Sequence, residues 1–235
     1  MKFFNKKDQE TPEKMSASQR RLLIQNDKFA VREAYKTLRT NVRFCLQGEG
    51  CKRICITSAM CGEGKSITFL NLAISIAEAG QKVLLIDADL RRPAVARLTG
   101  NAISPGLSNV LAGFVEEKEA ICKEVYPNLD IMFSGDVPPN PSELLGADAF
   151  KKLIESVSSQ YEYVLIDAPP VNLVSDACII ANCVDGVLVL VHQARSRKDS
   201  VMRAVNKLQL TGANVLGFVL NGVRLETDRK YGYYE

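Results

Sequence analysis

Apolar positions follow two different spacings along the chain. Near the start, apolar residues at positions 31, 34, 35, 38 and 42 recur every three or four residues, which predicts a helix from about residue 27 to the glycines at 48 and 50. Beyond it, short aliphatic runs predict strands at residues 53–58, 83–86, 129–133, 163–166, 186–191 and 215–220. Helical patterns lie between them at residues 66–79, 142–158, 176–182 and 199–210, and residues 92–128 are expected to form loops with short helices.

The predicted strands are continuous apolar runs rather than alternations of apolar and polar residues. Such runs are typical of parallel strands that are covered by helices on both faces. The sequence therefore predicts an α/β fold with a doubly wound, mostly parallel sheet. We expect a single domain at residues 27–222, a flexible N-terminal segment at residues 1–26 and a flexible tail at residues 223–235.

A phosphate-binding loop is expected at residues 59–66 (Ala-Met-Cys-Gly-Glu-Gly-Lys-Ser), between a predicted strand and a predicted helix. Gly62 and Gly64 allow the backbone to wrap around a phosphate, Lys65 can reach the β- and γ-phosphates, and Ser66 can bind Mg²⁺. Ala59 stands where the strict pattern has glycine. The fold is thus expected to be P-loop NTPase-like, with ATP bound by Gly62, Glu63, Gly64, Lys65, Ser66 and Ile67.

Three carboxylates end predicted strands. Asp87 and Asp89 follow the strand at 83–86, and Asp167 follows the strand at 163–166. Because the carboxyl ends of parallel strands share one edge of the sheet, we expect the three to converge beside the phosphate loop. One can hold a Mg²⁺-bound water and another can accept a hydroxyl proton. The alternative is that these acids cap the loops that follow them.

Composition narrows the classes of function. The net charge is only +3, which makes no case for nucleic acid. Seven cysteines are scattered among apolar residues without the usual zinc spacings, so they are interpreted as reduced thiols in a cytosolic protein. No apolar run approaches the roughly 18 residues that a membrane span needs.

Three polar features either leave their use open or point to regulation. Tyr231, Tyr233 and Tyr234 crowd the last five residues among charged neighbours, and together with the phosphate loop they suggest a kinase that phosphorylates itself. Glu33, Lys36 and Arg39 share the polar face of the first predicted helix, either as a solvated face or as a subunit contact. Arg91 and Arg92 suit either a phosphate group or a structural ion pair.

Several stretches together resemble the bacterial tyrosine kinase family of capsular and exopolysaccharide synthesis. They are the phosphate loop, residues 86–93 (Ile-Asp-Ala-Asp-Leu-Arg-Arg-Pro), residues 165–170 (Leu-Ile-Asp-Ala-Pro-Pro), the terminal tyrosines, and the stretches at 106–113 and 134–145. The resemblance covers residues 30–235 and identifies the chain with the short type of this family. Two positions depart from the family pattern: Cys61 replaces a proline and Lys36 replaces an arginine.

The resemblance implies a protein tyrosine kinase that uses ATP and Mg²⁺ to phosphorylate the tail of a neighbouring subunit, and so regulates polysaccharide polymerisation and export. It implies a ring-shaped homo-oligomer built through Glu33, Lys36 and Arg39. It also implies a cognate tyrosine phosphatase and a transmembrane polysaccharide co-polymerase adaptor that activates the kinase and recruits it from the cytoplasm to the inner face of the membrane. No nucleic-acid partner is implied.

The expected mechanism is phosphoryl transfer governed by positioning and charge neutralisation. Lys65 holds the phosphates. Ser66 binds Mg²⁺, and Asp89 and Asp167 arrange the waters bound to the metal. Asp87 accepts the tyrosine proton, although Asp87 and Asp89 could exchange roles. By analogy with related ATPases, Asn221 contacts adenine; a turn residue before Gly222 is the alternative.

Two other classes of function compete with the kinase. A partitioning or division-site ATPase would have a lysine early in its loop, where this chain has Met60. A non-catalytic nucleotide-binding scaffold would not need the lysine, serine and three aspartates that are present. Turnover of ATP without phosphotyrosine would favour the ATPase. Tight ATP binding with neither turnover nor phosphotyrosine would favour the scaffold.

Overall fold

A computed structural model describes residues 19, 22–25 and 28–223 of the chain. The tail expected from residue 223 onward lies almost wholly outside the described residues, and so does most of the segment 1–26. Tyr231, Tyr233 and Tyr234 are among the residues outside them.

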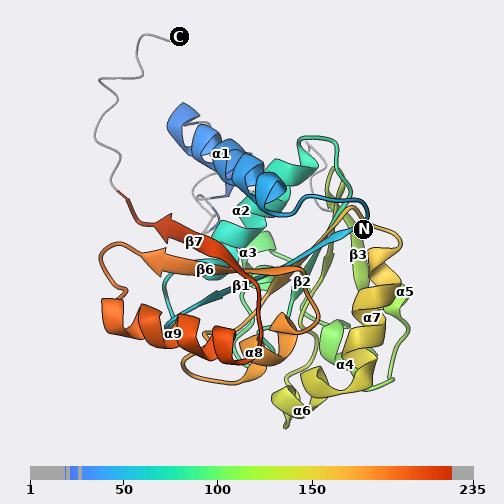
Figure 1. Ribbon diagram of the computed structural model, residues 1–235. Helices are drawn as coiled ribbons and strands as arrows, with labels where there is room; N and C mark the ends of the chain where they lie inside the picture. The colour runs from blue at the N-terminus through green and yellow to red at the C-terminus, as the bar shows by residue number, and fades with distance from the viewer. Residues whose placement is uncertain (1–18, 20–21, 26–27, 224–235) are drawn as a thin grey trace.

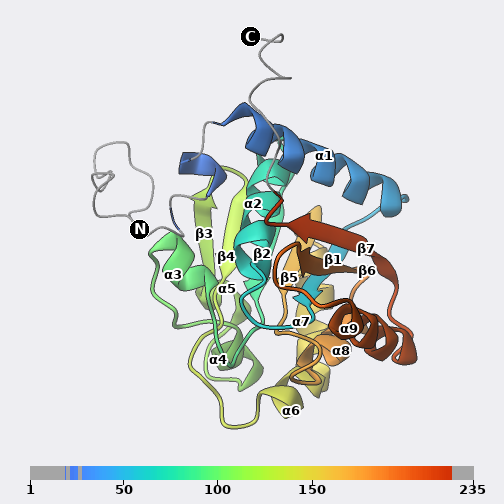
Figure 2. The same cartoon turned by 90° about the vertical axis from the view of Figure 1, so that its left-hand side faces the viewer.

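One sheet organises the described part of the chain (Figures 1 and 2). Its strands are β1 (Lys52–Ser58), β2 (Val83–Asp87), β3 (Ile121–Tyr126), β4 (Leu129–Met132), β5 (Tyr163–Asp167), β6 (Gly186–His192) and β7 (Val215–Asn221). The strand order is β3-β4-β2-β5-β1-β6-β7, and every neighbouring pair is parallel except β3 and β4. The helices are η2 (Leu23–Gln25), α1 (Phe29–Cys45), α2 (Lys65–Ala77), α3 (Val95–Thr99), α4 (Leu107–Leu111), α5 (Glu117–Ala120), α6 (Pro141–Gly146), α7 (Asp148–Ser158), α8 (Asp176–Ala181) and α9 (Lys198–Leu210).

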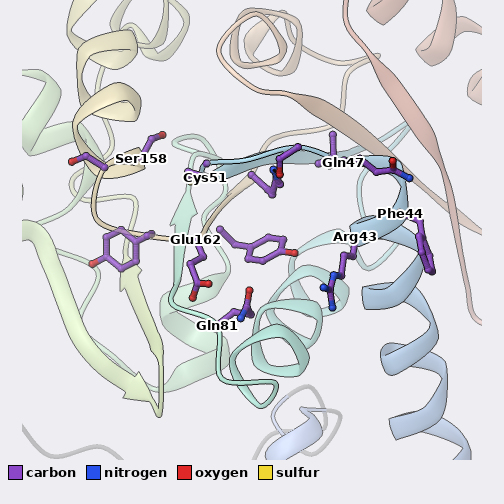
Figure 3. Close-up of a pocket in the computed structure, with 14 residues that line it drawn as sticks. Arg43, Phe44, Gln47, Cys51, Gln81, Ser158 and Glu162 are labelled. Carbon is purple, nitrogen blue, oxygen red and sulfur yellow. Dashed lines mark hydrogen bonds between the residues drawn. The ribbon is translucent and has the colours of Figure 1, made fainter.

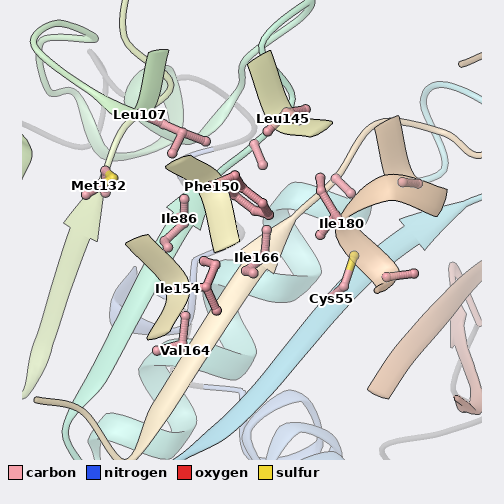
Figure 4. Close-up of a cluster of buried hydrophobic side chains, with 14 of the residues drawn as sticks. Cys55, Ile86, Leu107, Met132, Leu145, Phe150, Ile154, Val164, Ile166 and Ile180 are labelled. Carbon is pink, nitrogen blue, oxygen red and sulfur yellow. The ribbon is translucent and has the colours of Figure 1, made fainter. Parts of the chain in front are cut away.

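Two apolar layers sandwich the sheet, which confirms the doubly wound prediction. Helices α1, α2 and α3 cover one face, and α4 to α9 cover the other. In β2, Leu85 is buried on the first side and Ile86 on the second, so consecutive residues need apolar side chains. Figure 4 shows Phe150 of α7 packed over Ile86 and Ile166 on the second face. Among the described residues, no helix is both long and apolar enough to cross a bilayer.

Two parts of the sequence prediction were wrong. The stretch 92–128, expected to be loops and short helices, also contains β3 at the edge of the sheet. The helix expected at 142–158 is two helices, because Ala147 has an extended backbone between α6 and α7 (ψ 153°). The other predicted helices and strands are present, with ends that differ by about two residues or less from those expected.

The stretches at 106–113 and 134–145 meet beside the carboxyl end of β4. Leu107 N donates to Phe133 O at 2.7 Å, and Asn109 Nδ2 donates to Asp136 Oδ2 at 2.8 Å. A Cβ at Gly106 would overlap the backbone of both Phe133 and Gly135. Glycine at this position therefore permits the close approach of two chain segments.

We predict that Gly106→Ala lowers the free energy of unfolding by about 1–3 kcal/mol, because two backbone segments must move apart. Urea unfolding of the purified protein measures this. Gly146→Ala is the matched control, since the nearest atom to its new Cβ, Ile179 Cγ2, lies at 4.0 Å. Equal stabilities of the two variants would show that the loops separate without cost.

Candidate active site

The predicted phosphate loop joins β1 to α2 at the centre of the sheet. Gly62 and Gly64 both have positive φ angles, 77° and 96°, in the region that favours glycine. Lys65, Ser66 and Ile67 form the first turn of α2, so the amides of a helix N-terminus face the loop. Backbone amides arranged in this way suit the phosphate groups of a nucleotide.

The carboxylates expected to converge do lie together at one edge of the sheet. Asp87 of β2 stands directly opposite Asp167 of β5 in the parallel register. The Lys65 ammonium lies 3.0 Å from Asp89 Oδ2 and 3.4 Å from Asp167 Oδ1. All three acids are buried, at 0 to 5% exposed. Segments from β1–α2, β2 and β5 thus build a single charged cluster.

Backbone amides surround the Asp87 carboxylate. Its Oδ2 accepts hydrogen bonds from Ala94 N at 3.1 Å and Val95 N at 3.0 Å, and its Oδ1 accepts from Asp89 N at 3.3 Å. Asp87 therefore does hold the start of α3, as the capping alternative expected. The pKa of Asp87 is nevertheless raised from 3.8 to about 7, mainly by burial and to a smaller degree by the Asp167 carboxylate. A carboxylate with this pKa is suited to accept a proton near neutral pH.

Asp167 and Lys65 balance one another. Burial raises the pKa of Asp167, although the neighbouring Lys65 ammonium opposes the rise. Burial alone would lower the pKa of Lys65, but the Asp167 and Asp89 carboxylates outweigh it and raise that pKa, so the lysine stays charged. Within the part of the chain that the structure describes, the buried Asp167 Oδ2 has no hydrogen-bond partner. With Asp89 and the Ser66 hydroxyl, it forms an all-oxygen donor set of the kind that Mg²⁺ prefers.

The Asp87 environment predicts how stability depends on pH in the nucleotide-free protein. A folded-state pKa of about 7 against 3.8 means that the folded state keeps a proton which the unfolded state loses. The free energy of unfolding should therefore fall as pH rises from about 4 to about 7, by at most about 1.4 kcal/mol per pH unit for this proton.

We predict that Asp87→Asn removes this contribution, since the amide does not titrate. Urea unfolding in EDTA at pH 5, 6, 7 and 8 measures the difference between variant and wild type. That difference should move in favour of the variant as pH rises toward 7. A constant difference across the range would contradict the raised pKa.

Arg91 belongs to an ion pair rather than to an open phosphate site. Its Nε lies 2.9 Å from Asp176 Oδ2, and its Nη2 donates to Ser142 Oγ at 2.8 Å. Ser142 Oγ also donates to Asp176 Oδ1 at 2.6 Å. Of the two expectations for this arginine, the structure shows the ion pair. It ties the loop after Asp89 to α6 and α8.

Sequence reasoning missed a set of contacts behind the phosphate loop. Arg195 Nη1 donates to Gly62 O at 2.7 Å, and the Ser196 hydroxyl donates to the Glu63 carboxylate. Asn221 Nδ2 donates to Glu63 O at 2.9 Å, and its Oδ1 accepts from Gly222 N at 2.8 Å. Asn221 thus lies against the loop and also makes the expected turn contact. These residues follow or end β6 and β7, which lie next to β1 in the sheet, so they could have been found only if the strand order had been known.

The polar face of α1 is paired within the chain. Lys36 Nζ lies 2.6 Å from Glu33 Oε1, and both side chains are solvent-exposed. Arg39 Nη1 donates to Ser75 O of α2 at 2.5 Å. The exposed ion pair of Lys36 and Glu33 agrees with the solvated face that the sequence suggested, and a subunit contact through these residues stays a prediction.

A hollow of about 750 Å³ lies at the other end of the sheet (Figure 3). Arg43, Lys52, Gln81 and Glu162 are among its lining residues, at the amino ends of the strands and the carboxyl end of α1. The phosphate loop and the three aspartates lie at the opposite, carboxyl ends of the strands. The hollow is therefore separate from the candidate active site.

Known proteins resemble the chain over most of its length. A family model described as an AAA domain matches residues 51–214. Tyrosine-protein kinase YwqD of Bacillus subtilis (strain 168) is 38% identical over 202 residues, which cover 86% of this chain and 85% of the relative. Tyrosine-protein kinase CpsD of Streptococcus agalactiae serotype III (strain NEM316) is 40% identical over 203 residues, which cover 85% of each chain.

Solved structures show the same likeness. The kinase domain of Escherichia coli tyrosine kinase ETK gives a TM-score of 0.83 at 32% identity, covering 93% of this chain and 86% of that one. The chimerical protein CapA2B2 gives a TM-score of 0.82 at 33% identity, covering 89% of this chain and 91% of that one. The septum site-determining protein MinD of Pyrococcus horikoshii OT3, complexed with Mg-ADP, is less similar, with a TM-score of 0.62 at 27% identity and coverage of 72% and 70%.

Proposed function

The chain belongs to the bacterial tyrosine-protein kinase family, and we propose that it transfers the γ-phosphate of ATP to tyrosine side chains. The observation that carries the proposal is the cluster of Lys65, Asp87, Asp89 and Asp167 beside the phosphate loop. The cluster provides a cation for the phosphates and a carboxylate whose pKa suits proton acceptance. A nucleotide site with both features serves phosphoryl transfer.

The roles of the side chains follow from their positions. Lys65 and the loop amides hold the phosphates, and Asp87 accepts the proton of the incoming tyrosine hydroxyl. Ser66, Asp89 and Asp167 would hold Mg²⁺, which when bound supplies positive charge to the phosphate oxygens. The MinD relative complexed with Mg-ADP supports this metal and this type of ligand. Asn221, beside the loop at the end of β7, is proposed to contact adenine.

The proposed acceptors are Tyr231, Tyr233 and Tyr234 on a neighbouring copy of the chain. Each phosphate added brings about −1.5 to −2 charges. The active site already contains three carboxylates against one lysine, so a phosphorylated tail is repelled from it. Phosphorylation therefore releases the tail from the active site.

The proposed setting is polysaccharide synthesis at a membrane. The similarity to the chimerical protein CapA2B2 supports a partner protein, which we propose is a transmembrane adaptor that recruits and activates the kinase. A ring of subunits would form through Glu33, Lys36 and Arg39, for which Arg39 must exchange its contact with Ser75. A cognate phosphatase resets the tail, and the cycle regulates polymerisation and export.

Phosphosite mapping by mass spectrometry tests the proposal. The purified protein is incubated with Mg-ATP, with and without the cytoplasmic end of its adaptor, beside a variant in which Tyr231, Tyr233 and Tyr234 are phenylalanine. We expect phosphotyrosine on the tail of the wild type and none on that of the variant. ATP hydrolysis without any phosphotyrosine, even with the adaptor, would overturn the kinase in favour of an ATPase switch.

A further inference from the structure

We propose that Arg195 and Ser196, in the loop between β6 and α9, are positioning residues that orient the phosphate-binding amides. The inference rests on the proposed nucleotide binding at residues 59–66, and it adds residues from a distant part of the chain to that site. Both residues lie 133 positions beyond their partners in the phosphate loop. They reach it because β6 pairs directly with β1, with Leu190 opposite Ser58.

Arg195 fixes the direction of one peptide group. Its Nη1 donates to Gly62 O at 2.7 Å. In a trans peptide the carbonyl and the following N–H point in opposite directions. Holding the Gly62 carbonyl toward Arg195 therefore turns the Glu63 N–H away from Arg195. Asn221 does the same for the next peptide, because its bond to Glu63 O turns the Gly64 N–H away from β7.

Ser196 acts through the Glu63 side chain. Glu63 is only 2% exposed, and its carboxylate accepts both the Met60 N–H, at 2.9 Å, and the Ser196 hydroxyl. Ser196 Oγ in turn accepts the His192 N–H at 2.7 Å. The Glu63 carboxylate is therefore hydrogen-bonded on one side to the start of the loop and on the other to Ser196, which holds the loop in one conformation. Since Gly62 and Gly64 restrain the backbone little, this outside support sets the shape of the loop.

This arrangement predicts which part of the nucleotide depends on Arg195 and Ser196. Backbone amides at such loops bind phosphate, not the base or sugar. Loss of the support should therefore weaken the binding of ADP, which has a β-phosphate, more than the binding of AMP, which lacks one. A general loss of structure would weaken both to the same degree.

The test measures the dissociation constants of ADP and AMP by isothermal titration calorimetry. We expect Arg195→Ala to reduce the ADP-over-AMP preference about 5- to 10-fold, the loss that one charge-assisted hydrogen bond represents. Ser196→Ala should reduce it in the same direction by a smaller factor. Arg195→Lys, which keeps a donor, should recover part of the preference.

Arg197→Ala is the matched control, because it removes the same charge from the same loop, and no hydrogen bond joins the Arg197 side chain to the phosphate loop within the described residues. It should leave the preference unchanged. Equal weakening of ADP and AMP, or no change in Arg195→Ala, would overturn the inference. An effect in Arg195→Ala with none in Ser196→Ala would assign Arg195 to direct phosphate contact instead of positioning. Because the readout is binding, a failure of the tyrosine kinase proposal would not alter these outcomes.

Discussion

Replacing Lys65 with methionine is expected to lower the rate of tyrosine phosphorylation at least about 100-fold. Methionine is an unbranched side chain only one heavy atom shorter than lysine, and it carries no charge. The phosphates then lose the cation that the first turn of α2 provides. The measurement is the initial rate of phosphotyrosine formation with Mg-ATP.

The same substitution acts on the carboxylates. Lys65 Nζ lies 3.0 Å from Asp89 Oδ2 and 3.4 Å from Asp167 Oδ1, so Lys65→Met leaves two buried acids without this partner. The pKa of Asp167 should rise further, because the Lys65 ammonium no longer opposes the effect of burial, and the nucleotide-free protein should lose stability at neutral pH. Lys152→Met, at an exposed position of α7, is the control and should match the wild type. A Lys65→Met protein that retains a tenth of the activity would contradict the assigned role.

Replacing Asp87 with asparagine is the second substitution with a large expected effect. The rate of phosphorylation should fall about 10²- to 10⁴-fold near neutral pH, the usual contribution of a positioned base. Asparagine keeps an oxygen for the Ala94 and Val95 amides, so α3 should stay in place. Binding of ADP should therefore change little. Steady-state kinetics and calorimetry on the same preparation separate the two effects.

Asp89→Asn distinguishes the roles of the two acids. Asp89 pairs with Lys65 and is a proposed metal ligand, so its substitution should raise the Mg²⁺ concentration needed for half-maximal rate. Asp87→Asn should leave that concentration unchanged. The opposite pattern, with Asp87→Asn altering the metal requirement, would show that the two residues exchange roles.

Most of the fold could be predicted because parallel strands buried on both faces must be aliphatic throughout. Strand β3 could not, because it lies at an edge with one side in water, and Lys123 and Glu124 interrupt its apolar residues. The break between α6 and α7 also escaped prediction. The apolar spacing continues through Gly146 and Ala147, and only the backbone at Ala147 interrupts the helix.

The candidate site could be predicted as far as its residues follow strands in the sequence. Lys65, Asp87 and Asp167 stand in recognisable positions after aliphatic runs, and their convergence follows from the parallel register. The contacts of Arg195, Ser196 and Asp176 could not be foreseen, since nothing near them in the chain indicates their partners. The contact of Arg39 with Ser75 depends likewise on how α1 packs on α2.

The position of β1 in the sheet has a consequence for synthesis of the protein on the ribosome. This strand, which leads into the phosphate loop, comes early in the chain, yet its two neighbours are β5 (Tyr163–Asp167) and β6 (Gly186–His192). Both of its edges therefore stay unpaired until more than a hundred further residues have been translated. Pairings so distant along the chain form slowly and late. The nascent chain thus carries the nucleotide loop long before it can hold a nucleotide, and it becomes competent only when its last third has emerged.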